Sequence, residues 1–152
     1  MNVAVACDHG GFPLKQAVLD AVREAGHNPV DLGTDSTAAV DYPDFAAAAA
    51  RAIQDGRAAR AIVLCGSGVG AAVAANKLAG IRAGVCHDVY SAHQAVEHDD
   101  VNVLALGARV IGSAVAIELV RTFLAARYTA EPRHARRLAK VAALERQGGG
   151  RP

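Results

Sequence analysis

Short apolar runs alternate with longer amphipathic stretches along almost the whole chain. Each short run is followed by glycine or a turn-forming polar residue, which is typical of strands in a buried sheet. The predicted strands are Asn2–Cys7, Asn28–Leu32, Ala61–Cys65, Arg82–Cys86 and Asn102–Leu106. The predicted helices are Phe12–Ala25, Phe45–Gln54, Gly68–Leu78, Tyr90–Glu97, Ser113–Ala126 and, after Pro132, about Arg133–Arg146.

This alternation predicts a parallel sheet covered by helices on both faces, because right-handed crossovers place helices on either side as the winding direction changes. We expect one α/β domain over residues 1–147. Its architecture is a doubly wound five-stranded parallel sheet in a three-layer sandwich, with flavodoxin-type strand order and an additional C-terminal helix. Residues 148–152, which begin with three glycines, are expected to form a flexible tail.

Charge and cysteine content exclude several classes of protein. Sixteen basic and fifteen acidic residues leave a net charge of +1, so no broad field attracts nucleic acid or an anionic membrane. Three cysteines indicate neither a disulfide framework nor paired zinc ligands. The first apolar run reaches Asp8 too early for a signal peptide, and no uncharged stretch is long enough to span a bilayer. We expect a cytoplasmic protein whose anion recognition is local.

The third predicted strand ends in a thiol, Cys65, and leads directly into a glycine-rich turn, Gly66–Gly70, that opens a helix. Glycines let the backbone turn tightly and point successive N–H groups at one place. The helix adds unpaired N–H groups and the positive end of its dipole. This segment therefore predicts a site that favours an anion or a thiolate.

Known phosphate loops and cofactor fingerprints fit this turn to different degrees. It lacks the Lys-Ser or Lys-Thr pair of a Walker loop, and Ala71 stands where a phosphatase loop needs arginine. Gly66, Gly68 and Ala71 do satisfy the dinucleotide pattern G-x-G-x-x-A, and Asp88 follows about twenty residues later. That fingerprint assigns no role to Cys65. A non-catalytic module that binds a nucleotide or a sugar phosphate stays open as an alternative.

Two other segments carry candidate chemistry, each with a purely structural alternative. Asp8 and His9 follow the first strand, where Asp8 is equally suited to cap the next helix. Arg133 and Arg137 lie four residues apart at the start of the last predicted helix. Two cations at the positive end of a helix dipole are unfavourable unless an anion joins them, so a phosphate would resolve that tension. The structural alternative, which is the usual one for a basic cluster, is a solvated helix face.

Taken in order, the motifs resemble the type B ribose-5-phosphate isomerases, a family that includes the galactose-6-phosphate isomerase subunits. The resemblance covers about residues 1–146. It rests on Cys7-Asp8-His9-Gly10-Gly11-Phe12 with Leu14-Lys15, Asp41-Tyr42-Pro43, Cys65-Gly66-Ser67-Gly68-Val69-Gly70, Ala74-Ala75-Asn76-Lys77, Gly80-Ile81-Arg82-Ala83, Tyr90-Ser91-Ala92, His98, Asn102-Val103-Leu104, Gly107-Ala108-Arg109-Val110, Arg133-His134 and Arg137.

The resemblance implies an aldose–ketose isomerase that works through an enediolate and needs no metal or organic cofactor. The implied substrates are ribose 5-phosphate and ribulose 5-phosphate, with allose 6-phosphate or another pentose or hexose phosphate as the alternative. Cys65 would be the base, and Ser67 would help to move protons between the two oxygens. The backbone N–H groups of Gly66, Ser67, Gly68, Val69 and Gly70 would hold the oxyanion. Another branch of the family has a glutamate base at the position of Ala71.

The same resemblance implies the remaining site residues. His98 would open the furanose ring, Asp8, Tyr42 and Asp99 would contact sugar hydroxyls, and His9, Arg133 and Arg137 would bind the phosphate. It also implies a homodimer or homotetramer with shared active sites, in which His98 and Arg109 come from the neighbouring subunit. One departure is Asp99, since the family usually has asparagine there; an ionised carboxylate accepts hydrogen bonds but donates none.

Overall fold

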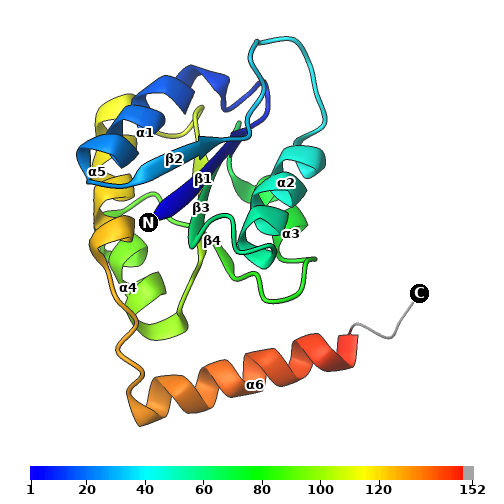
Figure 1. Ribbon diagram of the computed structural model, residues 1–152, viewed down its shortest axis with the longest axis vertical. Helices are drawn as coiled ribbons and strands as arrows, with labels where there is room; N and C mark the ends of the chain where they lie inside the picture. Colours follow the sequence, from blue (N-terminus) through cyan, green and yellow to red (C-terminus); the bar gives the residue numbers. More distant parts are fainter. Residues whose placement is uncertain (149–152) are drawn as a thin grey trace.

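The computed structural model describes residues 1–148 and contains an all-parallel sheet with helices on both faces (Figure 1). The strands are β1 (Asn2–Cys7), β2 (Asn28–Asp31), β3 (Arg60–Cys65), β4 (Ala83–Val85) and β5 (Val103–Gly107). The helices are α1 (Phe12–Glu24), α2 (Tyr42–Gln54), α3 (Val69–Ala75), α4 (Val89–Asp99), α5 (Ser113–Ala125) and α6 (Pro132–Gly148). The predicted doubly wound α/β sandwich is confirmed. Gly148, assigned to the tail from the sequence, ends α6, and residues 149–152 lie outside the described residues.

The strand order is β2-β1-β3-β5-β4, so the last two strands are exchanged relative to the flavodoxin-type order expected from the sequence. β4 has three residues, none of them fully buried, whereas all five residues of β5 are buried. A short, partly exposed strand suits the edge of a sheet, and a fully apolar one suits its interior. The chain therefore goes from β3 to the edge and turns back, and β5 becomes the neighbour of β3.

The two faces of the sheet pack against helices in different ways. One face carries large aliphatic side chains under α1, α4 and α5, among them Val5, Ile62, Leu64 and Leu104. The other face, under α2 and α3, is built largely from alanine, including Ala4, Ala6, Ala61 and Ala105. From the sequence, Ala46–Ala50 is expected only to favour helix formation. Ala46, Ala49 and Ala50 are in fact completely buried, so this run is also the packing surface of α2.

Element boundaries shift most where the site is formed. α2 begins at Tyr42, three residues before the expected start, because Pro43 fits the first turn of a helix, where no N–H is needed. α3 spans only Val69–Ala75, so it contributes a much shorter helix behind the glycine turn than the sequence predicts. Both changes affect the rim at the carboxyl ends of the strands.

The last helix crosses the opposite end of the sheet. In Figure 1, α6 runs beneath the body, below the lower end of α4. It contacts α4 near its start, and the backbone N–H of Gly80 donates to Oε1 of Glu145, 2.9 Å away, near its other end. Among residues 1–148, no helix has the length and apolar character needed to cross a membrane.

Candidate active site

A cleft of about 360 Å³ opens at the carboxyl ends of β1, β3 and β5. It brings together candidate site residues from four separate segments of the chain. The lining residues are Asp8, His9, Gly10, Tyr42, Cys65, Gly66, Ser67, Gly70, Arg109 and Val110. This agrees with the expectation that ligands bind at this edge of a parallel sheet.

The Cys65 loop is held firmly against the end of β5. The backbone N–H groups of Ala108 and Arg109 donate to the carbonyl oxygens of Cys65 and Gly66, at 2.9 and 3.0 Å. A Cβ atom added to Gly107 would lie 2.7 Å from the backbone carbonyl of Ser67, so only glycine allows this close approach. Gly68 has a φ of +83°, in the left-handed region, and begins α3. The loop conformation therefore depends on Gly68 in the turn itself and on Gly107 at the end of β5.

The thiol of Cys65 donates a hydrogen bond to the carboxylate of Asp8, with Sγ and Oδ2 3.0 Å apart. Burial raises the pKa of the Cys65 thiol, and the hydrogen bond and negative charge of Asp8 raise it further. Backbone hydrogen bonds from Gly66 and Gly68 act in the opposite direction but are smaller. The sequence led us to expect a thiolate. The structure instead favours a protonated thiol in the unliganded protein, because burial and then the contact with Asp8 both raise its pKa.

The Asp8 carboxylate has one contact in the turn before α1 and one in the cleft. Its Oδ1 atom accepts a hydrogen bond from the backbone N–H of Gly11 at 2.8 Å, which shapes the turn into α1. Its Oδ2 atom contacts Cys65. The carboxylate is 5% exposed, so its orientation is controlled by the surrounding backbone. It therefore stabilises the turn before α1 and lines the cleft, but it does not cap α1, whose N-cap residue is Gly11.

His9 and Tyr42 lie on either side of the loop. The backbone N–H of Val40 donates to Nδ1 of His9 at 3.2 Å, so a neutral His9 ring carries its proton on Nε2. The ring of Tyr42 lies against Gly70, where an added Cβ would approach it to 2.9 Å. Both residues line the cleft and offer hydrogen-bond donors to a polar ligand.

Arg109 lies in the cleft of its own chain. Its side chain would be 3.6 Å from a Cβ added to Gly66. The resemblance implies that this arginine comes from the neighbouring subunit. In the structure, Arg109 lines the cleft of the chain to which it belongs. The reason is the strand order: Arg109 follows β5, and β5 is the direct neighbour of β3. If β5 is placed next to β3, the position of Arg109 shortly after β5 predicts that it lies beside the Cys65 loop.

The other predicted site residues form a second group at the opposite end of the sheet. They are His98, Asp99, Arg133 and Arg137. α4 runs from the carboxyl end of β4 back to the amino end of β5, so His98 and Asp99 at its end lie opposite the Cys65 rim (Figure 1). Arg133 and Arg137 belong to α6, which crosses the same end. None of these four residues lines the cleft that contains Cys65. A single chain therefore divides the predicted site into two parts.

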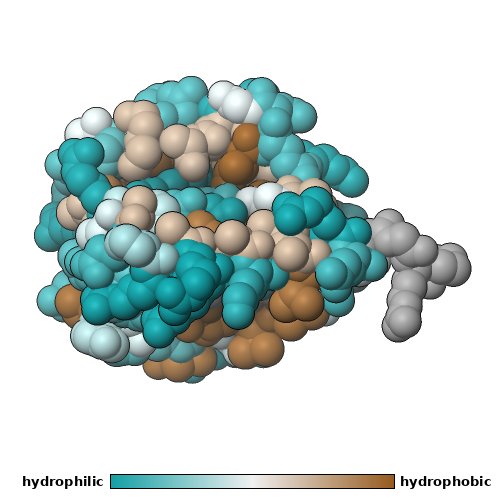
Figure 2. Space-filling model, turned by 90° about the horizontal axis from the view of Figure 1, so that it is seen from below, coloured by the Kyte–Doolittle hydropathy of each residue, from teal (hydrophilic) through white to brown (hydrophobic). Residues whose placement is uncertain are grey.

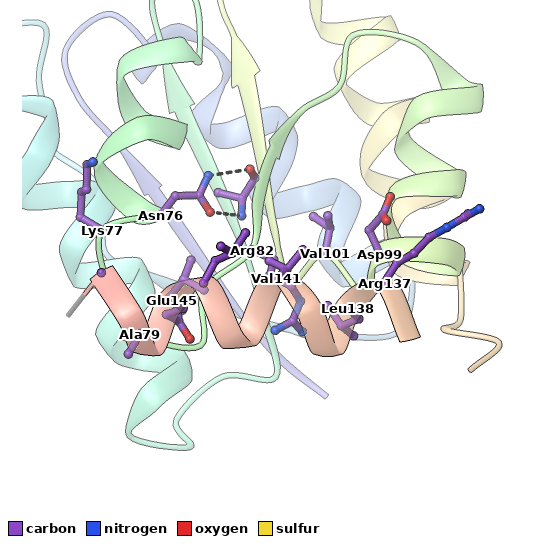
Figure 3. Close-up of a pocket in the computed structure, with 14 residues that line it drawn as sticks. Asn76, Lys77, Ala79, Arg82, Asp99, Val101, Arg137, Leu138, Val141 and Glu145 are labelled. Atoms are coloured by element: carbon purple, nitrogen blue, oxygen red, sulfur yellow. Dashed lines mark hydrogen bonds between the residues drawn. The ribbon is translucent and has the colours of Figure 1, made fainter. Parts of the chain in front are cut away.

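Asp99 and Arg137 of this second group line a larger cavity of about 700 Å³ between α6 and the segment that joins α3 to β4. Figure 3 shows the side chain of Arg137 extending from α6 beside that of Asp99, at the end of α4. Apolar side chains, among them Val101, Leu138 and Val141, line the cavity between these charged residues. Asn76 exchanges two hydrogen bonds with the backbone of Ala83, which holds one wall in place (Figure 3).

The dinucleotide alternative is not favoured by the topology. In that fold the acidic residue follows the strand beside the glycine loop. Here Asp88 follows β4, which β5 separates from β3. Its carboxylate instead accepts a hydrogen bond of 2.7 Å from the backbone N–H of Ser91, so Asp88 caps α4. Among the described residues, no group of three or more His, Cys, Asp or Glu side chains is arranged to hold a metal ion.

Comparison with known proteins identifies the family of this chain. The family described as Ribose/Galactose Isomerase matches residues 3–141. Ribose-5-phosphate isomerase B of Escherichia coli is 42% identical over 96% of this chain and 97% of its own length. D-erythrulose-4-phosphate isomerase of Pectobacterium atrosepticum is 40% identical over 84% and 85%. The solved structure of Trypanosoma brucei type B ribose 5-phosphate isomerase has a TM-score of 0.92 and 46% identity, covering 94% of this chain and 97% of that one. The chain belongs to the ribose/galactose isomerase family.

Proposed function

We propose that this protein interconverts ribose 5-phosphate and ribulose 5-phosphate through an enediolate, with Cys65 as the base. The observation that carries the proposal is the position of the Cys65 sulfur. It lies in a cleft beside loop N–H groups and 3.0 Å from the Asp8 carboxylate. The names of the Escherichia coli and Trypanosoma brucei relatives support this choice of substrate.

The reaction needs a base for the proton on C2 and a set of donors for the enediolate oxygens. The thiol must first lose its own proton, and Asp8 is the acceptor in contact with it. The Cys65 thiolate then takes the proton from C2 and returns it to C1. Backbone N–H groups of Gly66 to Gly70 stabilise the oxyanion, while Ser67 relays a proton between O1 and O2.

A homodimer or homotetramer completes the site in this proposal, because His98 and the two arginines lie at the far end of the sheet in their own chain. The Cys65 cleft of one copy would face the α4–α6 end of another. His9 and Arg109 would then bind the phosphate together with Arg133 and Arg137 of the partner subunit. His98 of the partner subunit would assist opening of the furanose ring, and Asp8 and Tyr42 would contact the hydroxyls.

Exposed apolar side chains on both surfaces support this contact. Around the cleft, Tyr42, Val69, Val73 and Val110 are between 41% and 56% exposed. On α6, Val141 and Leu144 are 53% and 66% exposed. Figure 2 looks at the molecule from below, the side of α6, and shows hydrophobic patches among polar side chains. Apolar surface of this kind at an unfinished site suits burial against another subunit.

Asp99 bears on which sugar phosphate is preferred. Its carboxylate can only accept hydrogen bonds from sugar hydroxyls, whereas the asparagine usual in the family can also donate. The Pectobacterium atrosepticum relative is named for a four-carbon substrate, D-erythrulose 4-phosphate. The substrate panel for this chain should therefore contain that tetrose phosphate and allose 6-phosphate beside the pentose phosphates.

The test is isomerisation by the purified chain and by Cys65→Ala. We expect the wild type to convert ribose 5-phosphate, and Cys65→Ala to lose turnover while calorimetry still detects ligand binding. Cys86→Ala is the matched control, since Cys86 is buried outside the cleft. Substantial turnover by Cys65→Ala would reject Cys65 as the base. Tight binding of NAD without isomerisation of any phosphosugar would instead support the cofactor-binding alternative.

A further inference from the structure

Two neighbouring imidazole rings at the α4–α6 contact have defined hydrogen-bond partners. The ring of His98 stacks on that of His134, with centroids 4.0 Å apart and an angle of 25° between the planes. The side chain of Gln94, one turn earlier on α4, lies with Nε2 2.9 Å from Nδ1 of His98. On the other side, Nε of Arg133 donates to Nε2 of His134 at 3.0 Å.

These contacts determine where the protons are. The Nε2 atom of a glutamine amide can only donate, so Nδ1 of His98 must accept, and a neutral ring carries its proton on Nε2. The guanidinium of Arg133 likewise can only donate, so Nε2 of His134 accepts and its proton is on Nδ1. Both rings are therefore neutral in this arrangement.

The surroundings act on the two rings in different ways. His134 is 3% exposed, and its pKa is lowered by burial first, then by the neighbouring His98 and Arg133. Oε2 of Glu97 lies 3.8 Å from Nε2 of His98, on the side where the proton is expected. Glu131 is engaged by Arg133 at 2.9 Å. The other charged groups at this end, Asp99 and Arg137, border the adjoining cavity.

We propose that Gln94 and His134 are positioning residues that hold His98 as a neutral imidazole with its proton on Nε2. The side-chain amide selects the tautomer, and the stacked ring of His134 holds the plane of the imidazole. This inference rests on the proposed function, since it concerns the residue that would open the sugar ring. It adds the identity of the atom that acts, Nε2, and the two side chains that prepare it.

The chemical step follows from this tautomer. As the C1–O4 bond of the furanose breaks, its electron pair goes to O4, and the Nε2–H of His98 donates a hydrogen bond to the developing charge. The C1 hydroxyl loses its proton to water as the aldehyde forms, and O4 gains a proton from water. No proton is gained or lost overall, and His98 ends the step in the neutral form in which it began. A neutral histidine acting as an electrophile is an established solution in isomerases.

Kinetics of Gln94→Leu test the role in ring opening. We expect at least a tenfold loss of kcat for ribose 5-phosphate. Exchange of the C1 proton of ribulose 5-phosphate with deuterated solvent should stay within about twofold of wild type, because that open-chain ketose reaches the enediolate without a ring. Gln16→Leu is the matched control, since Gln16 makes a comparable hydrogen bond to Asp20, four residues later on the exposed face of α1. Unchanged turnover, or equal losses of turnover and exchange, would overturn the proposal.

The tautomer itself is measured by nitrogen-15 NMR of histidine-labelled protein near neutral pH, with His98→Asn used to assign the signal. We expect wild-type His98 to give the Nε2-protonated pattern. Gln94→Glu should move the proton to Nδ1, because the carboxylate introduced there can only accept. An Nδ1-protonated wild-type ring, or the same pattern in both proteins, would refute the assignment. This measurement needs no turnover, so it separates failure of this inference from failure of the proposed isomerase activity.

Discussion

Cys65 and Asp8, which are 57 residues apart in the sequence, share a hydrogen bond of 3.0 Å from thiol to carboxylate. Asp8 is oriented by the backbone at Gly11, and Cys65 by the glycine turn that follows it. Burial raises the pKa of the Cys65 thiol in the unliganded protein, and the contact with Asp8 raises it further. It also provides the acceptor through which the thiol can lose its proton when a substrate is bound. This one contact therefore affects both the protonation of Cys65 in the free protein and the route by which the thiol loses its proton.

Asp8→Asn should make Cys65 more reactive and the enzyme less active. The substitution removes the negative charge and the carboxylate acceptor, so the pKa of Cys65 falls toward its ordinary value while the contribution of burial remains. We expect iodoacetamide to modify Cys65 several-fold faster at pH 7.5, with lower turnover. The wild-type alkylation rate should still be rising above pH 9. Asp20→Asn, on the exposed surface of α1, is the control; identical alkylation of Asp8→Asn and wild type would contradict the prediction.

Gly107→Ala should displace the Cys65 loop. The added methyl group would approach the carbonyl of Ser67 to 2.7 Å, and neither backbone segment can yield easily because both are hydrogen-bonded to each other's turns. We expect kcat to fall at least tenfold and the free energy of unfolding to fall by about 1–3 kcal/mol, as in other overpacked sites. Chemical denaturation and the isomerase assay measure the two effects. Gly112→Ala has open space around its Cβ and should change neither.

Mixing two inactive variants should restore activity if the site is shared between subunits. Cys65→Ala lacks the base, and His98→Asn lacks the ring-opening group, which in our proposal comes from the other copy. A two-fold dimer containing one chain of each kind has one intact site. After unfolding and refolding together, the mixture should recover about a quarter of wild-type activity, since about half of the dimers are mixed. Activity no higher than that of the separate variants would argue that each site uses one chain.

Cys7 should make the protein less stable at high pH. Burial raises its pKa from 9.0 to about 11, so the unfolded chain loses the thiol proton at lower pH than the folded one. The contribution of the protonated Cys7 thiol to the free energy of unfolding is complete below pH 9. It falls by about 2–3 kcal/mol as the pH rises to 11. Denaturant unfolding at several pH values, compared with Cys7→Ala, isolates this term. The variant should show a smaller loss over the same range; parallel curves would be inconsistent with a buried thiol.

Local pattern was enough to predict the fold class and the rim. Parallel strands all present their carboxyl ends at one edge, so Asp8 and His9 after β1 and the loop after Cys65 of β3 fall at the same edge. The order of the last two strands could not be predicted in this way. It depends on competition between β4 and β5 for the interior of the sheet, and that comparison requires the burial of whole strands.

What the sequence by itself determined is the set of chemical groups and the strand, turn or helix on which each is found. Tertiary structure decided how those groups act on one another. The protonation of Cys65 depends on the distant Asp8, and the tautomer of His98 depends on Gln94 beside it. The direction of α4 carries His98 away from Cys65 within one chain. Local patterns reflect backbone preference and burial, whereas pKa values, tautomers and shared sites arise from contacts that exist only after the chain has folded.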